Sequence, residues 1–332
     1  MLDSPATDSA VPDSPALDAV ADVLTSEPAR SSVPGVAIMC HQRPDADTVG
    51  SALALARILR ARGIESTVSY PDAVPLPAGI AALPGAETFG PPGDAPVAVA
   101  VDCASRERLG DLRPWFEAAA TTVVVDHHRS NVGFGTVDLV DPAANCTTEL
   151  ILRIADRLGV DVDAATADCL YAGLVTDTGS FRWTTPAGHR IAARLLAAGA
   201  SGRELARSLL DTHPAAWLTL VSRVLGSSVE VPAAFGGRGA VYAVCTAADL
   251  GGLPWESAES LIDLLRTVES VEVAALFKEG APGTWSASLR AKSEIDVSEF
   301  ARGFGGGGHQ LASGYSAEGT ADEVVREFLA RA

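Results

Sequence analysis

The sequence contains very little lysine: Lys278 and Lys292 are its two lysines, so arginine supplies nearly all of the 25 basic residues. Acidic residues are far more numerous, at 42, and the formal net charge is −17. Proteins that grip long DNA or RNA usually present a basic face. The charge balance therefore argues against a long nucleic acid as partner, but not against a small phosphorylated substrate held by metal ions and a few arginines.

Cysteine and long apolar runs are also scarce. The five cysteines form no Cys-x-x-Cys pair, and their odd number favours buried, reduced thiols over a disulfide framework. No apolar run approaches the length of about 20 residues that a membrane span needs, and the first residues lack the basic and apolar regions of a signal peptide. We therefore expect a cytoplasmic protein that does not interact with membranes.

The chain has 332 residues, of which 47% are hydrophobic, and is long enough for two domains with buried cores. Residues 1–30 are rich in Asp, Ser, Pro and Ala, which predicts a mostly disordered tail, with the start of a helix over residues 18–24. Residues 31–205 alternate short β-branched runs with helical stretches, the pattern of an α/β domain with a doubly wound parallel sheet. A connecting segment at 206–236 and a smaller α+β domain at 237–332 complete the predicted organisation.

Four short segments place acidic or imidazole side chains directly after apolar runs. The runs cover residues 36–40, 96–101, 122–125 and 170–175, and each is predicted to be a buried strand. The segments that follow contain His41, Asp45 and Asp47, then Asp102, then Asp126, His127 and His128, and finally Asp177. The carboxyl ends of strands in an open parallel sheet line one crevice, so these segments would converge there. Carboxylates and imidazoles in this mixture bind divalent metal ions, and the sequence predicts a site for a pair of them.

Each segment taken alone also has a structural explanation. The pair Asp45 and Asp47 would suit a solvated turn before a helix, while the spacing of a calcium-binding loop is absent. Asp102 is placed either to bridge two metal ions or to cap a following helix. Two adjacent histidines at a strand end are not both expected in a core, so one can bind metal while the other faces a substrate, with Asp126 orienting an imidazole. Residues 147–149 are expected to cap the start of their own helix.

A glycine-rich segment near the end of the chain, residues 303–308, is followed by His309. Consecutive glycines let backbone N–H groups approach a phosphate closely, and the histidine adds a hydrogen-bond donor. The alternative is a flexible glycine loop. Phe304 and Tyr315 flank the segment and are placed to stack a base, which the sequence alone does not decide, whereas Trp183 is expected to be a packing residue.

Taken together, these segments resemble the motifs of the DHH phosphoesterase superfamily. The motifs read His41-x-x-Pro-Asp-x-Asp47-x-x-Gly-Ser51, Val-Asp102, Asp126-His-His128 and Gly-Leu-Val-Thr-Asp177-Thr-Gly. The later segment Phe304-Gly-Gly-Gly-Gly-His309-Gln-Leu-Ala-Ser-Gly314 is similar to the signature of the DHH-associated C-terminal domain, except that Ser313 stands where the family usually has a second alanine. Motif order, spacing and two-domain length, over about residues 33–320, resemble the NrnA type of bifunctional oligoribonuclease and 3′-phosphoadenosine 5′-phosphate phosphatase.

The resemblance implies a site with two divalent metal ions, usually Mn²⁺, in the first domain. One ion would be held by His41, Asp45 and Asp102, and the other by Asp47, Asp102, His127 and Asp177, with Asp102 as the bridge. The catalytic residues would be Asp102, Asp126 and His128, and His128 would contact the scissile phosphate. In the second domain the substrate would be bound by Arg290, Gly306, Gly307, Gly308 and His309. Two ions that share a carboxylate can clamp one phosphate and activate a water, which agrees with these roles.

The implied function is hydrolysis of very short oligoribonucleotides or dinucleotides to mononucleotides. The expected substrates are pApA, with cyclic di-AMP and 3′-phosphoadenosine 5′-phosphate as further ones, and the resemblance suggests a homodimer. Another enzyme of the superfamily, an inorganic pyrophosphatase or a RecJ-like single-strand exonuclease, stays open as an alternative. So does a non-enzymatic nucleotide sensor. The net charge disfavours the exonuclease, the glycine-rich segment favours nucleotides over pyrophosphate, and the complete set of ligands disfavours the sensor.

Overall fold

The computed structural model describes residues 14–71 and 75–332 and divides into two compact units, Met1–Asp211 and Thr212–Ala332. The division lies between helices α9 (Gly202–Leu210) and α10 (Ala216–Gly226). It falls inside the segment 206–236, which the sequence assigns to a connection.

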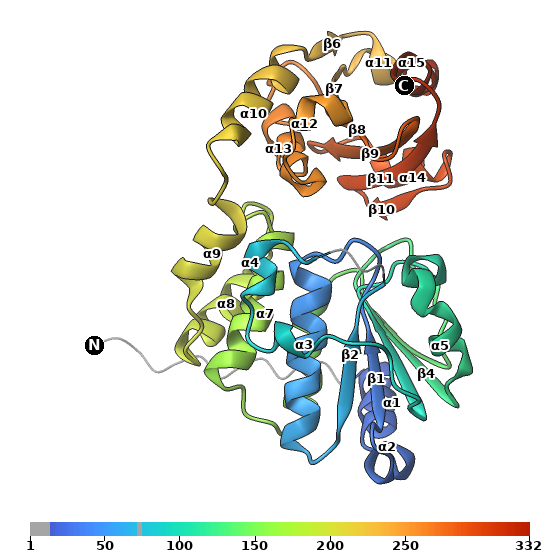
Figure 1. Ribbon diagram of the computed structural model, residues 1–332, viewed down its shortest axis with the longest axis vertical. Coiled ribbons are helices and arrows are strands. Elements are labelled where there is room, and N and C mark those ends of the chain that lie inside the picture. The colour runs from blue at the N-terminus through green and yellow to red at the C-terminus, as the bar shows by residue number, and fades with distance from the viewer. Residues whose placement is uncertain (1–13, 72–74) are drawn as a thin grey trace. The chain divides into compact units, whose positions relative to one another are not determined.

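The first unit is built, within the described residues, on a five-stranded parallel sheet with strand order β2-β1-β3-β4-β5 (Figure 1). The strands are β1 (Val36–Met39), β2 (Ser66–Ser69), β3 (Val97–Val101), β4 (Thr121–Asp126) and β5 (Val137–Val140). The helices are α1 (Pro15–Leu24), α2 (Glu27–Ser31), α3 (Ala46–Ala61), α4 (Ala78–Ala81), α5 (Arg113–Ala118), α6 (Thr147–Arg157), α7 (Ala164–Asp177), α8 (Pro186–Ala197) and α9, with 3₁₀ helices η1 (Ala86–Thr88) and η2 (Arg106–Leu112). The predicted α/β fold with a parallel sheet is confirmed.

Both faces of this sheet are buried, which explains why its central strands read as unbroken apolar runs. Along β1, Val36 and Ile38 join the core formed with α3, α6 and α7. The alternate residues Ala37 and Met39 pack on the opposite side, in the core that includes η2 and α5. Figure 1 shows α3 and α5 on opposite sides of the sheet. The sheet is therefore doubly wound.

The strand order places a topological switch between β1 and β3. From β1 the chain moves to β2 on one side, and it then returns to β3 on the other side. In open α/β sheets the crevice at such a switch, at the carboxyl ends of the strands, is where ligands bind. His41 and Asp102 lie just beyond β1 and β3, so both side chains start at this crevice.

One predicted strand is a helix. Residues 170–175 belong to α7, so Asp177 is the last residue of a helix and does not follow a strand. Helix α7 packs against α3, α6, α8 and α9, and a helix buried on most sides is apolar all round, like a buried strand. Its contact with α3 is very close: a Cβ at Gly50 would lie 2.3 Å from the Cys169 carbonyl oxygen. The strand prediction was wrong, although its consequence, a carboxylate near the other segments, is retained.

Of residues 1–30, predicted to be a mostly disordered tail, the described part is helical, and the helix expected to start over residues 18–24 is part of α1. Residues 1–13 lie outside the described residues, but α1 and α2 occupy most of the remainder. The apolar side chains of α1 recur at helical spacing, and Leu17, Val20 and Leu24 are buried in the core beside β5 and α6. The Asp, Ser and Pro residues that suggested disorder include the first residues and the exposed face of this helix.

The second unit contains, in the described part of the chain, a six-stranded mixed sheet of order β10-β11-β9-β8-β7-β6. Its strands are β6 (Val229–Val231), β7 (Ala240–Cys245), β8 (Val273–Glu279), β9 (Thr284–Ala291), β10 (Gly307–His309) and β11 (Ala312–Glu318). Its helices are α10, α11 (Ala234–Gly237), α12 (Ala247–Leu250), α13 (Leu261–Leu265), α14 (Val297–Arg302) and α15 (Ala321–Arg331), with the 3₁₀ helix η3 (Trp255–Ala258). Helices α14 and α15 pack on one face, and α10 and α13 on the other. The predicted α+β domain is confirmed.

Two further sequence predictions concern the oxidation state of the cysteines and the absence of a membrane span. All five cysteines lie in described residues and are buried free thiols. Burial raises the pKa of the Cys40 thiol above its ordinary value, so this thiol stays protonated. No helix in residues 14–71 and 75–332 is long and apolar enough to cross a membrane.

Candidate active site

The first motif places Asp45 at the start of α3, where its two carboxylate oxygens have different tasks. Oδ1 accepts hydrogen bonds from the N–H groups of Asp47 and Thr48, at 3.1 Å each, and so caps the helix. Oδ2 lies 3.5 Å from Nε2 of His41. Capping therefore holds the carboxylate in place and leaves one oxygen to face the histidine.

His41, Asp45 and Asp102 form a first group of possible ligands at the switch between β1 and β3. Nε2 of His41 lies 3.4 Å from Oδ2 of Asp102, and both residues are buried. Burial and the nearby Arg108 guanidinium lower the pKa of His41, but the carboxylates of Asp45 and Asp102 outweigh them and raise it to about 9. The ring is therefore surrounded by negative charge on the side of Nε2.

His127 is the centre of a second group, in which its Nε2 lies 3.0 Å from Oδ2 of Asp177 and 3.8 Å from Oδ2 of Asp47. It also lies 3.6 Å from Oδ1 of Asp102. Burial, together with the carboxylates of Asp102 and Asp177, raises the pKa of Asp47 well above its ordinary value. Asp102 thus turns Oδ2 to the first group and Oδ1 to the second, which is the arrangement of a bridging carboxylate.

The backbone of Asp102 is unusual in a way that serves this orientation. Its φ of +60° is left-handed, a conformation that aspartate tolerates better than most residues. Its N–H still donates to the Val125 carbonyl oxygen at 2.9 Å, and the hydroxyl of Thr147 donates to Oδ1 at 2.8 Å. The carboxylate is therefore fixed both by its own backbone and by a neighbouring helix.

The first residues of helix α6 hold one of the carboxylates in place. This contact could not be predicted from the sequence. The backbone N–H groups of Thr147 and Thr148 donate to Oδ2 and Oδ1 of Asp47, at 2.7 Å and 2.9 Å. Residues 147–149 were expected to cap their own helix, but the first turn of α6 instead binds a carboxylate from α3. A helix N-terminus stabilises negative charge, so α6 offsets part of the repulsion between Asp47 and its neighbours.

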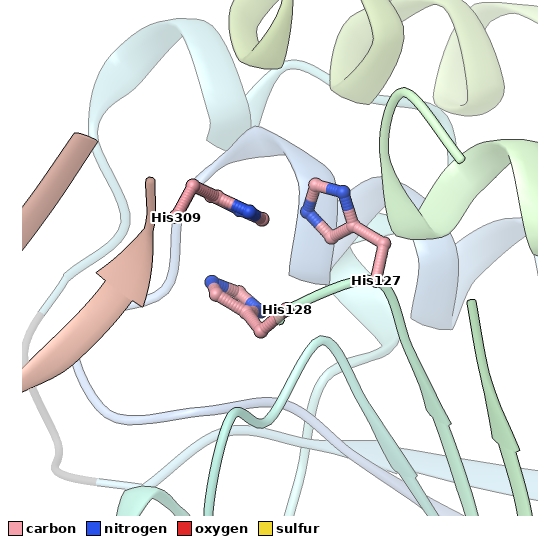
Figure 2. Close-up of side chains that lie close together, drawn as sticks. All are labelled: His127, His128 and His309. Carbon is pink, nitrogen blue, oxygen red and sulfur yellow. The ribbon is translucent and has the colours of Figure 1, made fainter. Parts of the chain in front are cut away.

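Asp126 holds His128 and does not itself have a free oxygen. Its Oδ1 lies 2.7 Å from Nδ1 of His128 and accepts the His127 N–H at 2.8 Å, while Oδ2 accepts from the side-chain amide of Asn131 at 2.7 Å. Figure 2 shows the rings of His127 and His128 close together after β4, with centroids 5.0 Å apart. The side chain of His128 is 20% exposed and that of His127 is 4% exposed. The two histidines therefore differ in their surroundings: His127 is buried among carboxylates, and His128 is more exposed.

The donor set fits divalent cations. Four carboxylates and two imidazoles form the two groups, and Nε2 of each imidazole lies 3.0 to 3.8 Å from the carboxylate oxygens around it. Ligand atoms that bind one ion at about 2.1 Å in tetrahedral geometry lie about 3.4 Å from one another, which agrees with these separations. In addition to burial, repulsion among the carboxylates of Asp47, Asp102 and Asp177 acts to raise the pKa values of Asp47 and Asp177, and cations between them relieve that repulsion.

In the second unit, Arg290 and His309 lie on one row of the sheet. His309 of β10 pairs with Ala312 of β11, and Ala312 pairs with Arg290 of β9. Directly opposed residues of antiparallel strands project to the same face, and two strand spacings separate the two side chains by about 10 Å. His309 is the third histidine labelled in Figure 2. Arg290 has a weak ion pair, in which its Nε lies 3.9 Å from Oδ1 of Asp263.

The predicted phosphate-binding glycines are partly a strand and not only a loop. Gly307 and Gly308 belong to β10 and pair with Gly314 and Ser313 of β11. A Cβ at Gly306 would lie 2.2 Å from the Gly314 carbonyl oxygen, so this glycine is needed for close packing. Strand β10 is an edge of the sheet, and the N–H groups on its outer side point away from the ladder.

The structure shows how the aromatic residues that the sequence singled out are packed. Phe304 and Tyr315 stack on each other, with ring centroids 4.2 Å apart, and the Arg331 guanidinium lies 4.0 Å above the Phe304 ring. Tyr315 is 5% exposed, so its ring is a packing surface and not a platform for a base. Trp183, expected to pack, is 46% exposed but its ring lies against Gly179, where a Cβ would be 2.1 Å from the ring, and its Nε1 donates to the Asp177 carbonyl oxygen at 2.7 Å.

Comparisons with known proteins agree with the motifs. Residues 35–174 match the N-terminal domain of the DHH family, and residues 239–332 match the DHHA1 domain. A bifunctional oligoribonuclease and PAP phosphatase NrnA of Thermus thermophilus is 32% identical over 311 residues, which cover 89% of this chain and 90% of that protein. The chain belongs to the DHH phosphoesterase family and is of the NrnA type. It is accordingly a phosphoesterase, a hydrolase.

Solved structures share this fold over nearly the whole chain. An exopolyphosphatase-related protein from Bacteroides fragilis matches with a TM-score of 0.81 at 22% identity, covering 95% of each chain. RecJ from Thermus thermophilus, solved in complex with Mn²⁺, matches with a TM-score of 0.53 at 16% identity and covers 96% of this chain and 54% of its own.

The DHH domain brings the predicted metal ligands of four separate motifs together, and the DHHA1 domain aligns Arg290 with His309. Four supporting residues were not identified from the sequence: Arg108, Asn131, Thr147 and Thr148. In the sequence they are marked only by their position, a few residues after a strand or at a helix start near a motif. Many other residues occupy such positions, so position alone does not identify them.

Proposed function

We propose that this DHH-family chain is a two-metal phosphodiesterase that cleaves very short oligoribonucleotides, pApA included, to mononucleotides. We propose that it also removes the 3′-phosphate from 3′-phosphoadenosine 5′-phosphate. The observation that carries the proposal is Asp102, whose two oxygens face two separate groups of possible ligands. The NrnA relative supports the choice of substrates by its name, and RecJ bound to Mn²⁺ supports the choice of metal.

Two divalent ions, bound by His41, Asp45, Asp47, Asp102, His127 and Asp177, would acidify a water and stabilise charge on the phosphate. His128 supplies a proton at the same place. Burial acts to lower the pKa of His128, but the carboxylate of Asp126 outweighs it and raises the pKa. Since Nδ1 is held by Asp126, Nε2 is the ring atom that can donate to a phosphate oxygen.

The DHHA1 domain would bind an anionic or polar part of the substrate. Arg290 can form two parallel hydrogen bonds with a phosphate, and His309 adds a donor about 10 Å away on the same face. The glycines of β10 allow close approach to its backbone. Two donor sites at this spacing suit a molecule of two to a few nucleotides, and the net charge of −17 disfavours a long strand.

Three further points belong to the proposal. Cyclic di-AMP is a possible second substrate because its products would be the same short nucleotides. Free thiols at all five cysteines, each in the described residues, support work in the reducing cytoplasm. A homodimer is proposed on the resemblance to NrnA-type proteins, and light scattering at several protein concentrations would test it.

The test is a turnover panel with Mn²⁺ on one preparation. The panel contains pApA, a long single-stranded RNA, cyclic di-AMP, 3′-phosphoadenosine 5′-phosphate and pyrophosphate, and Asp102→Asn protein serves as the blank. We expect AMP from pApA and little attack on the long RNA. Preference for pyrophosphate or for the long RNA would replace the proposal by the corresponding superfamily enzyme. Binding of nucleotides without any turnover would indicate a sensor.

A further inference from the structure

The guanidinium of Arg108 lies beside the first group of possible ligands, but in the described part of the chain it is not paired with a carboxylate. Its Nη2 lies 2.9 Å from Nδ1 of His41, and among the described residues it forms no ion pair. Its neighbour Arg106 pairs with Glu117 at 3.5 Å and donates to the Phe134 carbonyl oxygen at 3.2 Å. An arginine that lies among several carboxylates without pairing with one is available to another anion.

The backbone of Arg108 is held firmly next to His41. The N–H of Gln42 donates to the Arg108 carbonyl oxygen at 2.7 Å, which ties η2 to the loop after β1. Gly110, with a φ of +52°, lies against Gln42, where a Cβ would be 2.7 Å from the side-chain nitrogen. Any change in what Arg108 binds must therefore come from movement of its side chain and not of η2.

The contact between Arg108 and His41 is not one that a ligand histidine can keep. Nδ1 of His41 has a second neighbour, the Gln42 carbonyl oxygen at 2.7 Å. A neutral imidazole that binds a cation through Nε2 carries its proton on Nδ1, and that N–H donates to the Gln42 oxygen. A guanidinium can only donate, so it has no acceptor at an Nδ1 that carries a proton.

We propose that the Arg108 side chain binds a non-bridging oxygen of the substrate phosphate that is cleaved at the DHH site. This inference rests on the proposed function and adds a phosphate-binding residue to it. Arginine is always charged, and two bound cations would offset the carboxylates around it, so an anion that joins the site stabilises its charge. A phosphate is that anion, and its oxygens match the planar fork of donors on arginine.

The test separates binding of metal from binding of phosphate. Mn²⁺ is titrated calorimetrically into metal-free wild type, Arg108→Gln and Arg108→Lys, and AMP is then titrated into each protein saturated with Mn²⁺. For Arg108→Gln we expect AMP affinity to fall about tenfold to a hundredfold, and KM for pApA to rise similarly, because a charge-assisted hydrogen bond is lost. Mn²⁺ affinity should stay the same or increase, since a positive charge near the site is removed. Arg108→Lys should lie between, because it keeps the charge without the fork.

Arg106→Gln is the matched control, because it removes an arginine from the same 3₁₀ helix and should leave AMP affinity unchanged. If Arg108→Gln weakens Mn²⁺ binding but at saturating Mn²⁺ binds AMP as tightly as wild type, Arg108 only orients His41 and the inference is wrong. Unchanged affinities for both ligands would also overturn it. Since AMP binding is measured without turnover, a wild type that binds AMP through Arg108 but does not cleave pApA would refute the proposed function and leave only the phosphate-binding role of Arg108. Should Arg108→Gln not fold, judged by its melting temperature, Arg108→Lys carries the same comparison.

Discussion

The DHH domain and the DHHA1 domain are suited to ligands of opposite charge. The first uses mainly side chains, and the second also uses the backbone. In the DHH domain, side chains after β1, β3 and β4 and on α3 and α7 bring carboxylates together, and most of these are buried. In the DHHA1 domain, Arg290 and His309 are only partly buried and stand on one row of a sheet beside an edge strand of glycines. The first region depends on side-chain chemistry, and the second depends largely on backbone.

The difference follows from the electrostatic repulsion within each site before a ligand binds. A cation site gathers like charges that repel one another, so it needs donors such as the N–H groups of α6 to hold Asp47 in place. An anion site can use backbone N–H groups that a strand edge already presents. Damage to the DHH domain should therefore appear as loss of metal and of kcat, and damage to the DHHA1 domain as a rise in KM.

The largest effect is expected for Asp102→Asn. Asparagine tolerates the left-handed backbone at this position, so the fold should survive, but the bridge between the two groups loses its charge. We expect kcat for pApA to fall about a thousandfold or more. Calorimetric titration should show fewer than two Mn²⁺ ions bound. Asp141→Asn, which removes a carboxylate paired with Arg153 away from both groups, is the control. Near-normal turnover by Asp102→Asn with two ions bound would defeat the two-metal assignment.

The second prediction concerns pH. In the metal-free protein the pKa of His41 is raised to about 9, so the ring is protonated at neutral pH and must lose a proton to bind a cation. Loss of the His41 proton should therefore contribute a rise in Mn²⁺ affinity of about tenfold per pH unit, about a hundredfold between pH 6 and pH 8, and this contribution should level off near pH 9. Titrations in buffers with different ionisation heats count the protons released.

The same shift has an opposite consequence for the stability of the metal-free protein. A folded-state pKa above the unfolded value of 6.5 means that protonated His41 stabilises the fold. That stabilisation is complete below about pH 6.5 and is lost as the pH rises through about 9. Metal binding that released no protons at pH 7, or that weakened as pH rose, would contradict the assignment of His41 as a ligand.

A smaller loss is expected for Thr147→Val, which keeps the shape of the side chain and removes the hydroxyl that donates to Asp102. Residues that orient ligands typically contribute about tenfold to a hundredfold to metal affinity. We expect about a tenfold weaker Kd for Mn²⁺, with kcat restored at high Mn²⁺ concentration. Thr176→Val is the control, because the Thr176 hydroxyl bonds only to carbonyl oxygens of its own helix. Equal Mn²⁺ affinity in the two variants would remove Thr147 from the site.

The sequence allowed correct prediction of proximity for charged side chains that lie at the end of a strand. His41, Asp102 and Asp126 each follow or end an apolar β-branched run, and all strands of a parallel sheet end at the same edge when read in one direction. Convergence could therefore be predicted without knowing the strand order. Asp177 was placed correctly for a wrong reason, because six apolar residues do not distinguish a buried strand from a buried helix.

Contacts between distant segments were beyond sequence reasoning. The backbone N–H of Thr147 donates to Asp47, which lies 100 residues earlier in the sequence. A pair of threonines at a helix start does not indicate which carboxylate they will contact. The glycines at 306–308 looked like a loop because the strand pattern depends on side chains, which they lack. The side-chain pattern of their partner strand, β11, is itself interrupted by Gly314.

In the DHHA1 domain, His309→Ala should sharpen the comparison, because it should raise KM for pApA about tenfold and leave kcat and Mn²⁺ affinity unchanged. Loss of one donor on the row shared with Arg290 weakens substrate binding without touching the carboxylates. Gln310→Ala changes the next side chain, which is exposed, and serves as the control. An unchanged KM for every short substrate would remove the binding role, and a loss of Mn²⁺ would break the division between the two domains.

The smallest effect is expected for Ser313→Ala, which restores the alanine usual in the family. The Ser313 hydroxyl is buried and donates to the Val297 carbonyl oxygen at 2.6 Å, so it connects β11 to the start of α14 behind the glycine strand. Removing it leaves that oxygen without this donor and should lower the free energy of unfolding by about 1 kcal/mol, as a loss of one buried hydrogen bond usually does. Urea denaturation measures this. The side chain is on the face of β11 that packs against α14, and β10 keeps its backbone pairing, so KM for pApA should equal that of wild type. A rise in KM as large as that of His309→Ala would mean that this serine, and not the glycine backbone alone, determines the geometry of the substrate-binding edge.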